Sequence, residues 1–151
     1  AGLGGEIRFW KVRMKPGKPV VFAIVRGKPV FALPGNPVAA MVAYEQFVRP
    51  ALLRMMGHTR IFRPVVKAVL KDGARNKGDR PHLIRVRVSL KEGRYEASIT
   101  GSQSSARLAS MTGGNGLLTL APGASLSAGD EAPVRLLDRN FEMGEFLDGA
   151  G

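Results

Sequence analysis

Apolar and polar positions largely alternate over residues 6–14 (EIRFWKVRM), near the start of the chain. A period of two is typical of a half-buried β-strand. Trp10 and Met14 would then lie on one face of the strand, and Lys11 and Arg13 on the opposite face. The sequence therefore predicts a first strand with one solvated, cationic face.

Two short apolar runs, residues 19–25 and 28–33, follow a break at residues 15–19 (KPGKP). Two prolines and a glycine in five residues favour a turn or an extended loop at this break. Both apolar runs are rich in β-branched and aromatic residues, which is typical of strands that are buried on both faces. Because only two residues separate the runs, we expect them to be antiparallel neighbours.

Residues 38–57 predict one long helix, with signals for its start, its interruption and its end. Asn36 can cap the helix, Pro37 suits the first helical position, and Gly57 suits the position after the last turn. Pro50 lacks an N–H group and should kink or split the helix, because the carbonyl oxygen four residues earlier loses its donor.

Beyond the helix the chain changes to short strands and turn residues, which predicts a small all-β barrel or sandwich. The candidate strands are residues 63–70, 82–90, 94–100, 116–120 and 132–137. Arg85 and Arg87 alternate with aliphatic residues in HLIRVRVSL, so we expect both arginines to face solvent or a ligand. The fold class is therefore α/β, with strands and one helix in residues 1–59, followed by an all-β domain in residues 60–151.

Composition narrows the function classes. The chain has 44% apolar and 23% charged residues, as ordinary globular proteins do. It contains no cysteine, which excludes disulfides, thiolate metal sites and cysteine nucleophiles and favours a reducing cytoplasm. With only two histidines, a zinc enzyme is disfavoured. We expect no signal peptide and no membrane span, because the most apolar helix contains charged residues.

Charge points to anionic partners. The chain has 23 Lys and Arg residues against 12 Asp and Glu residues, a net charge of +11. The positive excess lies in residues 1–107, whereas residues 108–151 are net acidic. A strongly basic surface attracts nucleic acid, phosphate esters, oxyanions or acidic lipid, or it simply keeps the chain soluble. The sign of the charge does not choose among these.

Three segments could bind an anion. The strand-turn-helix at residues 28–38 offers backbone N–H groups and a helix N-terminus, or its PGNP turn is only a cap. Lys11, Lys15 and Lys18 place cations at a constrained turn, or they form a solvated basic face. The polar run at residues 100–105 (TGSQSS) follows a strand and offers hydroxyl and backbone donors, or it is an ordinary loop.

Three stretches of the chain can be compared with known families: KVRMKPGKPVVFA, GKPVFALPGNPVAAMVAYEQFVRPALLRMMG, and a β-rich module that contains RPHLIRVRV and TGSQSSARLASM. Together they closely resemble the C-terminal part of the molybdopterin molybdenumtransferases, of the MoeA and gephyrin E-domain type. The likeness covers nearly the whole chain. It implies that residues 1–59 belong to a MogA-like molybdopterin-binding domain and that residues 60–151 are the family's C-terminal β-barrel.

The resemblance implies that molybdate is inserted into adenylylated molybdopterin with release of AMP, assisted by a divalent ion, usually Mg²⁺. Two groups of site residues follow from it. The catalytic group at molybdate and phosphate would be Lys15, Lys18, Arg85 and Ser105, and the cofactor-binding group would be Lys11, Pro19, Gly35 and Asn36. Several fixed cations and hydroxyl donors suit an oxyanion that carries two negative charges.

The sequence also departs from the family's pattern. Full-length members carry the preceding half of the α/β domain, with a TTGGxSxGxxD-like phosphate loop and acidic metal ligands, and two further N-terminal domains. Because these parts do not occur in the present sequence, we expect a fragment that is inactive alone and contains no metal ligands. A sheet face built to meet missing strands would favour a homodimer.

Two functions of other classes stay open on the residues alone. A basic β-barrel could bind RNA or DNA through phosphates, but the aromatic residues needed for base stacking are sparse, at 7% of the chain. The β module could instead mediate protein interaction or dimerisation. We therefore predict part of a cytoplasmic molybdenum-inserting transferase, with membrane and nucleic-acid partners disfavoured.

Overall fold

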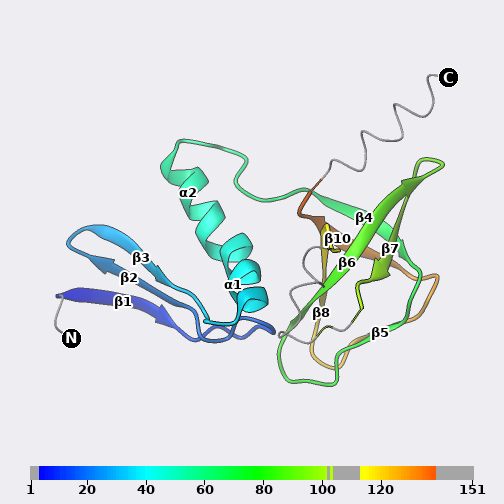
Figure 1. Ribbon diagram of the computed structural model, residues 1–151, viewed down its shortest axis with the longest axis horizontal. Helices are drawn as coiled ribbons and strands as arrows, with labels where there is room; N and C mark the ends of the chain where they lie inside the picture. The colour runs from blue at the N-terminus through cyan, green and yellow to red at the C-terminus, as the bar shows by residue number, and fades with distance from the viewer. Residues whose placement is uncertain (1–3, 102, 104–112, 139–151) are drawn as a thin grey trace. The chain divides into compact units, whose positions relative to one another are not determined.

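The computed structural model describes residues 4–101, 103 and 113–138, and the chain divides into two compact units. Unit 1 comprises residues 1–62 and unit 2 comprises residues 63–151. Unit 1 combines a small sheet with one helical segment, and unit 2 is built from strands (Figure 1).

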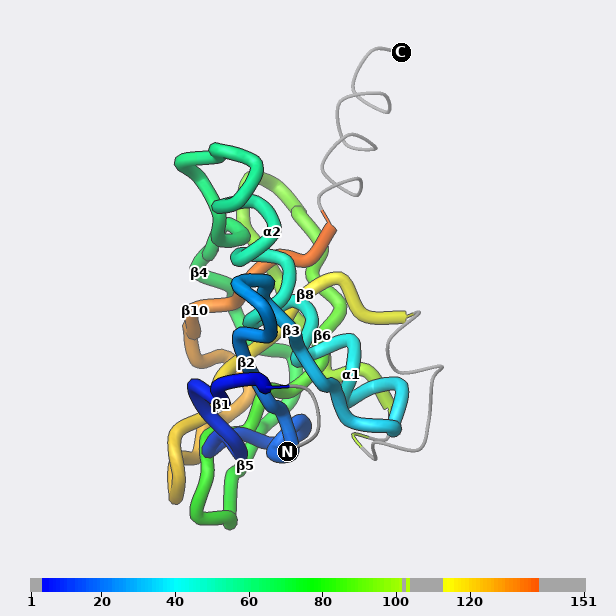
Figure 2. The backbone as a smooth tube through the Cα atoms, turned by 90° about the vertical axis from the view of Figure 1, so that its left-hand side faces the viewer, coloured from blue at the N-terminus to red at the C-terminus, as the bar shows by residue number. Residues whose placement is uncertain are grey.

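Unit 1 contains a three-stranded antiparallel sheet in the order β1-β2-β3 (Figure 1 and Figure 2). Its strands are β1 (Gly5–Trp10), β2 (Val21–Val25) and β3 (Lys28–Ala32). The predicted antiparallel hairpin is confirmed, and its two turn residues, Arg26 and Gly27, both have positive φ. A two-residue turn of this kind matches the right-handed twist of the strands it joins.

The first strand is shorter than the alternation over residues 6–14 predicts. It ends at Trp10, because Lys11 has a φ of 64° and leaves the extended conformation. Trp10 is 61% exposed whereas Met14 is buried, so the prediction that they share one strand face is wrong. The Lys11 N–H instead donates to the carbonyl oxygen of Val20 at 3.0 Å, which closes a loop.

A helix in three parts follows β3, namely α1 (Pro37–Ala43), the π-helical turn η1 (Tyr44–Val48) and α2 (Arg49–Met55). The predicted cap is confirmed, because Asn36 Oδ1 accepts a hydrogen bond from the Ala39 N–H at 3.2 Å. The predicted interruption before Pro50 is confirmed as a π turn, in which the Arg49 N–H donates to the Tyr44 carbonyl five residues earlier.

Aromatic side chains pack the helix against one face of the sheet. The Phe22 ring lies 5.6 Å from the Phe9 ring and 4.7 Å from the Phe31 ring, and Phe47 of η1 lies 5.7 Å from Phe9. The prediction that β2 and β3 are buried on both faces is wrong, because this helix covers only one face. Val30 of β3, for example, is 43% exposed.

Unit 2 contains a closed five-stranded barrel in the order β10-β4-β7-β6-β8, which confirms the predicted barrel. The strands are β4 (Val65–Leu70), β6 (His82–Lys91), β7 (Arg94–Ile99), β8 (Gly116–Leu120) and β10 (Glu131–Leu136). Neighbouring strands are antiparallel except β4 and β7, which are parallel. A small ribbon of β5 (Ala74–Arg75) and β9 (Ser125–Leu126) was not predicted, because two-residue strands leave no periodic pattern.

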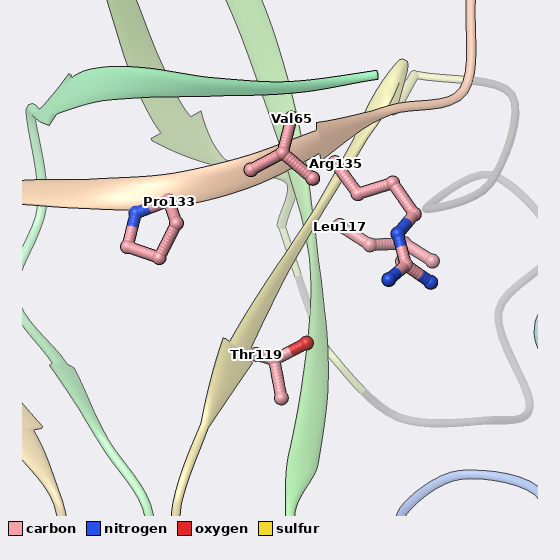
Figure 3. Close-up of a pocket in the computed structure, with 5 residues that line it drawn as sticks. All are labelled: Val65, Leu117, Thr119, Pro133 and Arg135. Carbon is pink, nitrogen blue, oxygen red and sulfur yellow. The ribbon is translucent and has the colours of Figure 1, made fainter. Parts of the chain in front are cut away.

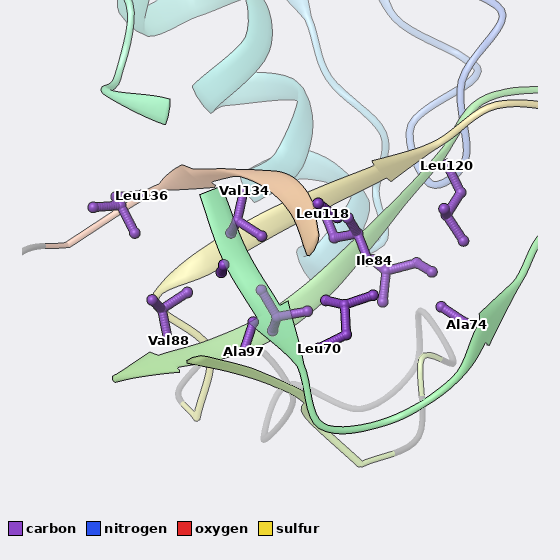
Figure 4. Packing of buried hydrophobic residues seen from close by; sticks show 12 residues of the cluster. Leu70, Ala74, Ile84, Val88, Ala97, Leu118, Leu120, Val134 and Leu136 are labelled. Carbon is purple, nitrogen blue, oxygen red and sulfur yellow. The ribbon is translucent and has the colours of Figure 1, made fainter. Parts of the chain in front are cut away.

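Aliphatic side chains fill the interior of the barrel (Figure 4). Ile84, Val86 and Val88 of β6 all belong to this core, as the alternation in β6 predicts. The strands approach so closely at Gly116 that an added Cβ would lie 2.8 Å from Val88 Cγ2 and 2.9 Å from Val134 Cγ1. Glycine in a strand often marks such a close approach.

We expect Gly116→Ala to lower the free energy of unfolding by about 1–3 kcal/mol, because the methyl group would overpack the barrel core. Gly73→Ala is a matched control in the same unit, since an added Cβ there would meet only the Leu126 carbonyl oxygen, at 3.4 Å. Urea denaturation measures both variants. Equal stability of the two variants would contradict the tight packing at Gly116.

Candidate functional site

The predicted lysines lie in one loop of unit 1, residues 11–20, which we call the Pro-Gly loop. A second main-chain bond closes this loop, because the Val12 N–H donates to the Lys18 carbonyl at 2.9 Å. Lys11, Lys15 and Lys18 are all exposed. The loop therefore holds three ammonium groups at the surface on a closed backbone frame.

The centre of the Pro-Gly loop packs inward while its lysines point outward. Pro16 follows Lys15 through a cis peptide bond, and Gly17 is buried with a φ of 106°. A Cβ at Gly17 would meet Met14 Cε and would lie 3.5 Å from the Ala39 carbonyl oxygen of α1. Glycine suits this position because its φ lies in the left-handed region, which other residues rarely adopt.

The three lysines differ in their surroundings. Lys11 Nζ lies 4.1 Å from the centroid of the Trp10 ring, a cation–π contact that holds this ammonium beside the end of β1. Neither Lys15 nor Lys18 forms a salt bridge with the described residues. An anionic ligand could therefore engage Lys15 and Lys18 without displacing a carboxylate.

The other predicted cofactor-binding residues lie at the edges of the same unit. Pro19 is exposed at the end of the Pro-Gly loop, and Gly35 and Asn36 form the turn before α1. Asn36 uses its side-chain oxygen for the helix cap, whereas Gly35 is exposed with open space around its Cα. A ligand role for this turn stays a prediction.

Arg85 in unit 2 is buried, which excludes the first of the two predicted alternatives, that it faces solvent; that it faces a ligand stays a prediction. Its side chain leaves the barrel on the side opposite the core, yet the residue is only 1% exposed. Alternation assigns a side chain to one face of a strand but does not say what covers that face. Burial lowers the pKa of the Arg85 guanidinium from its ordinary value by desolvation, although an arginine remains charged at neutral pH. Arg87 is exposed, as predicted.

Two amide side chains form hydrogen bonds with the main chain of β6. The sequence reasoning did not single out either residue. Gln103 Oε1 accepts from the Arg85 N–H at 2.9 Å, and Gln103 Nε2 donates to the Arg85 carbonyl at 3.1 Å. Asn115 does the same for Val88, at 2.6 and 2.9 Å. The available signal was their position, since each amide stands in a polar stretch just outside a strand.

The polar run at residues 100–105 lies beside Arg85 as far as it is described. The Thr100 N–H and hydroxyl donate to the Arg85 carbonyl at 3.1 and 3.0 Å, so the start of this run lies alongside β6. Ser105, the predicted catalytic serine, lies outside the described residues. Within unit 2 the structure therefore brings together Arg85 and the first part of the predicted polar run.

A shallow depression of about 200 Å³ lies on the outer face of the barrel (Figure 3). It is lined by Val65, Leu117, Thr119, Pro133 and Arg135, and none of the predicted site residues contributes to it. The described residues contain no group of three His, Asp or Glu side chains that could hold a metal ion. None of the described helices has the length and apolar character needed to cross a bilayer.

Two family models match the chain, and each match lies within one unit. Residues 1–54 match the model described as "Probable molybdopterin binding domain", and residues 67–137 match the model described as "MoeA C-terminal region (domain IV)".

Relatives and solved structures give the same result. The molybdenum cofactor synthesis protein cinnamon of Drosophila melanogaster is 35% identical over 143 residues, which cover 90% of this chain and 24% of the relative. The molybdopterin molybdenumtransferase of Staphylococcus aureus (strain COL) is 30% identical over 144 residues, which cover 94% and 34%. A solved structure of the molybdopterin biosynthesis MoeA protein from Pyrococcus horikosii superposes with a TM-score of 0.73 at 28% identity, covering 89% of this chain and 33% of that chain. The chain thus spans between 24% and 34% of the length of these relatives.

The fold and the matches define a class of protein in which an α/β unit precedes a closed β-barrel, as in the proteins of molybdenum cofactor biosynthesis. The chain belongs to the MoeA family and corresponds to the C-terminal region of its members. The predicted family is therefore confirmed. The alternative of a nucleic-acid-binding barrel is not supported by these matches.

We expect Gly17→Ala to destabilise the Pro-Gly loop by about 1–3 kcal/mol, because alanine is strained at a φ of 106° and its methyl group would meet Met14. Gly35→Ala is the control in the same unit, since its φ lies outside the left-handed region and a Cβ would have open space. Thermal unfolding compares the two. A Gly17→Ala protein that unfolds at the same temperature as Gly35→Ala would contradict the described loop.

Proposed function

We propose that the chain provides part of the molybdate and phosphate site of a molybdenum-inserting transferase. In the proposed reaction, molybdate is inserted into adenylylated molybdopterin and AMP is released. Membership of the MoeA family supports this function, and the Staphylococcus aureus relative is named a molybdopterin molybdenumtransferase. The observation that carries the proposal is the Pro-Gly loop, which presents Lys15 and Lys18 on a closed backbone.

Lys15 and Lys18 would donate N–H groups to the oxygens of a tetrahedral dianion. Because the main chain already holds the loop closed, little backbone order has to be gained on binding. Cations that are fixed in advance also stabilise charge that develops on phosphate as AMP leaves. Lys11, held over Trp10, would attract the negatively charged cofactor, and Pro19 would contact it.

Arg85 of unit 2 would provide a second kind of cation for an oxyanion. Its guanidinium presents several N–H donors in a fixed planar fork, which suits the paired oxygens of molybdate or phosphate. Burial strengthens its electrostatic interactions, because water screens a buried charge less. Ser105 would add a hydroxyl donor, and the turn at Gly35 and Asn36 would receive the pterin-phosphate side of the substrate.

Three further features complete the proposal. Assistance by Mg²⁺ would come from ligands outside the described residues, and we derive no step through the ion. A homodimer is supported by exposed apolar side chains such as Ile7 and Met55, each 64% exposed. Analytical ultracentrifugation tests the dimer, and a monomer at high protein concentration would contradict it.

A cytoplasmic location is supported by the absence of cysteine.

We expect the chain to bind molybdate, and we expect Lys15→Ala and Lys18→Ala each to weaken binding by about tenfold or more. A hydrogen bond to a charged group contributes roughly 1.5–3 kcal/mol, and 1.4 kcal/mol corresponds to a factor of ten. Lys28→Ala removes an equal charge from an exposed position on β3, outside the loop, and should change the affinity by no more than about twofold. Isothermal titration calorimetry at constant ionic strength measures all four proteins.

Two results of this titration would contradict the proposal. One is an absence of molybdate binding by the unmodified chain. The other is an equal loss of affinity in Lys28→Ala, which would show that net charge attracts the anion and that the loop has no special part in binding it.

A further inference from the structure

On the β7 side, the regular strand pairing of β6 ends just before Arg85, whereas on the other side Arg85 still pairs with Leu117 of β8. The pairing of β6 with β7 runs from the Lys91–Arg94 pair to the Val86–Ile99 pair, and Arg85 is the first residue beyond it. Gln103 takes over at this point, because its side-chain oxygen and nitrogen meet the N–H and the carbonyl of the same residue, Arg85. A residue of a neighbouring strand would make this pair of bonds.

The amide of Gln103 also joins Arg85 to the start of the polar run. Gln103 Nε2 donates to the Thr100 carbonyl at 2.7 Å, and Thr100 itself donates to the Arg85 carbonyl through its N–H and its hydroxyl. The main chain of Arg85 is thus bonded on both of its polar groups from one side. Without Gln103, its N–H would lose the partner that the structure gives it.

Fixing the main chain of Arg85 matters because its side chain is long and buried. The direction in which a side chain leaves a strand follows from the orientation of its main chain. A small rotation at the Arg85 Cα is therefore amplified at the guanidinium. A charged group holds an anion well only when surrounding bonds keep it within a narrow range of positions.

Asn115 provides an internal comparison on the same strand. Its amide brackets Val88, again through one accepted and one donated bond, but Val88 is a core residue that is 1% exposed. Gln103 and Asn115 thus make equivalent bonds to β6. Only Gln103 makes them to a residue with functional chemistry.

We propose that Gln103 is a positioning residue. Its amide makes the two main-chain hydrogen bonds that a neighbouring strand would make, and so holds Arg85 in the orientation needed to bind an oxyanion. The part of this inference in which Arg85 binds an oxyanion rests on the function proposed above. The part in which Gln103 positions Arg85 rests on the hydrogen bonds of Gln103 alone.

The experiment compares Gln103→Ala with Asn115→Ala in the 151-residue chain. Both variants lose two bonds to β6, so both should lower the melting temperature. We expect amide hydrogen exchange at Arg85 to accelerate by about tenfold in Gln103→Ala and to stay unchanged in Asn115→Ala, in which exchange at Val88 should accelerate instead. The NMR signal of the Arg85 Nε–Hε group should shift only in Gln103→Ala. If Gln103→Ala does not fold, Gln103→Met keeps the length of the side chain and removes its hydrogen bonds.

Molybdate titration of the same proteins provides the functional readout. We expect Gln103→Ala to weaken binding by about tenfold and Asn115→Ala to leave it within about twofold of the unmodified chain. An unchanged Arg85 side-chain signal in Gln103→Ala would overturn the positioning role, and so would an equal loss of affinity in Asn115→Ala. If the unmodified chain binds no molybdate, the proposed function fails, and the Arg85 signal alone decides whether Gln103 positions Arg85.

Discussion

Positive side chains repel one another and are flexible, so a site for a dianion exists only where the main chain holds several of them in place. In both units, hydrogen bonds to the backbone hold the residues that we propose for this role. In unit 1, Lys11 and Val20 close the Pro-Gly loop, and Val12 and Lys18 close it again one step further in. The lysines themselves contribute little order, because their long side chains are exposed.

In unit 2, the proposed cation, Arg85, is held on a strand. β6 is ten residues long, and it pairs with β8 along its first half and with β7 along its second half. Each change of neighbour leaves part of one edge without a partner strand. Gln103 and Asn115 supply the missing bonds there, and the close approach at Gly116 lets β8 pack beside Val86 and Val88. Closure of the barrel and orientation of Arg85 are therefore linked through one strand.

Local signals in the sequence predicted much of the fold. The hairpin, the Asn36 cap, the interruption before Pro50 and the five barrel strands depend on short patterns of apolar, proline and glycine residues, and all are confirmed. The end of the first strand could not be predicted in this way. The left-handed conformation of Lys11 depends on a bond to Val20, nine residues later, which alternation does not encode.

The candidate site was less predictable than the fold. Alternation placed Arg85 on the face of β6 opposite the core, but its burial depends on what covers that face, which is set by tertiary structure. From the sequence, Gln103 looked like an ordinary loop residue. Its role depends on where the pairing of β6 with β7 ends, at Val86, one residue before Arg85. The resemblance to a family suggested which residues to examine, and the contacts of each unit explain how those residues are held.

The most direct measurement is the position of a bound tungstate ion, a heavy analogue of molybdate, located by anomalous X-ray scattering in crystals of the chain. The predicted result is a peak within hydrogen-bonding distance of the Lys15 and Lys18 ammonium groups. A tungstate peak at other cations, with both lysines unoccupied at saturating concentration, would contradict the assignment of the site.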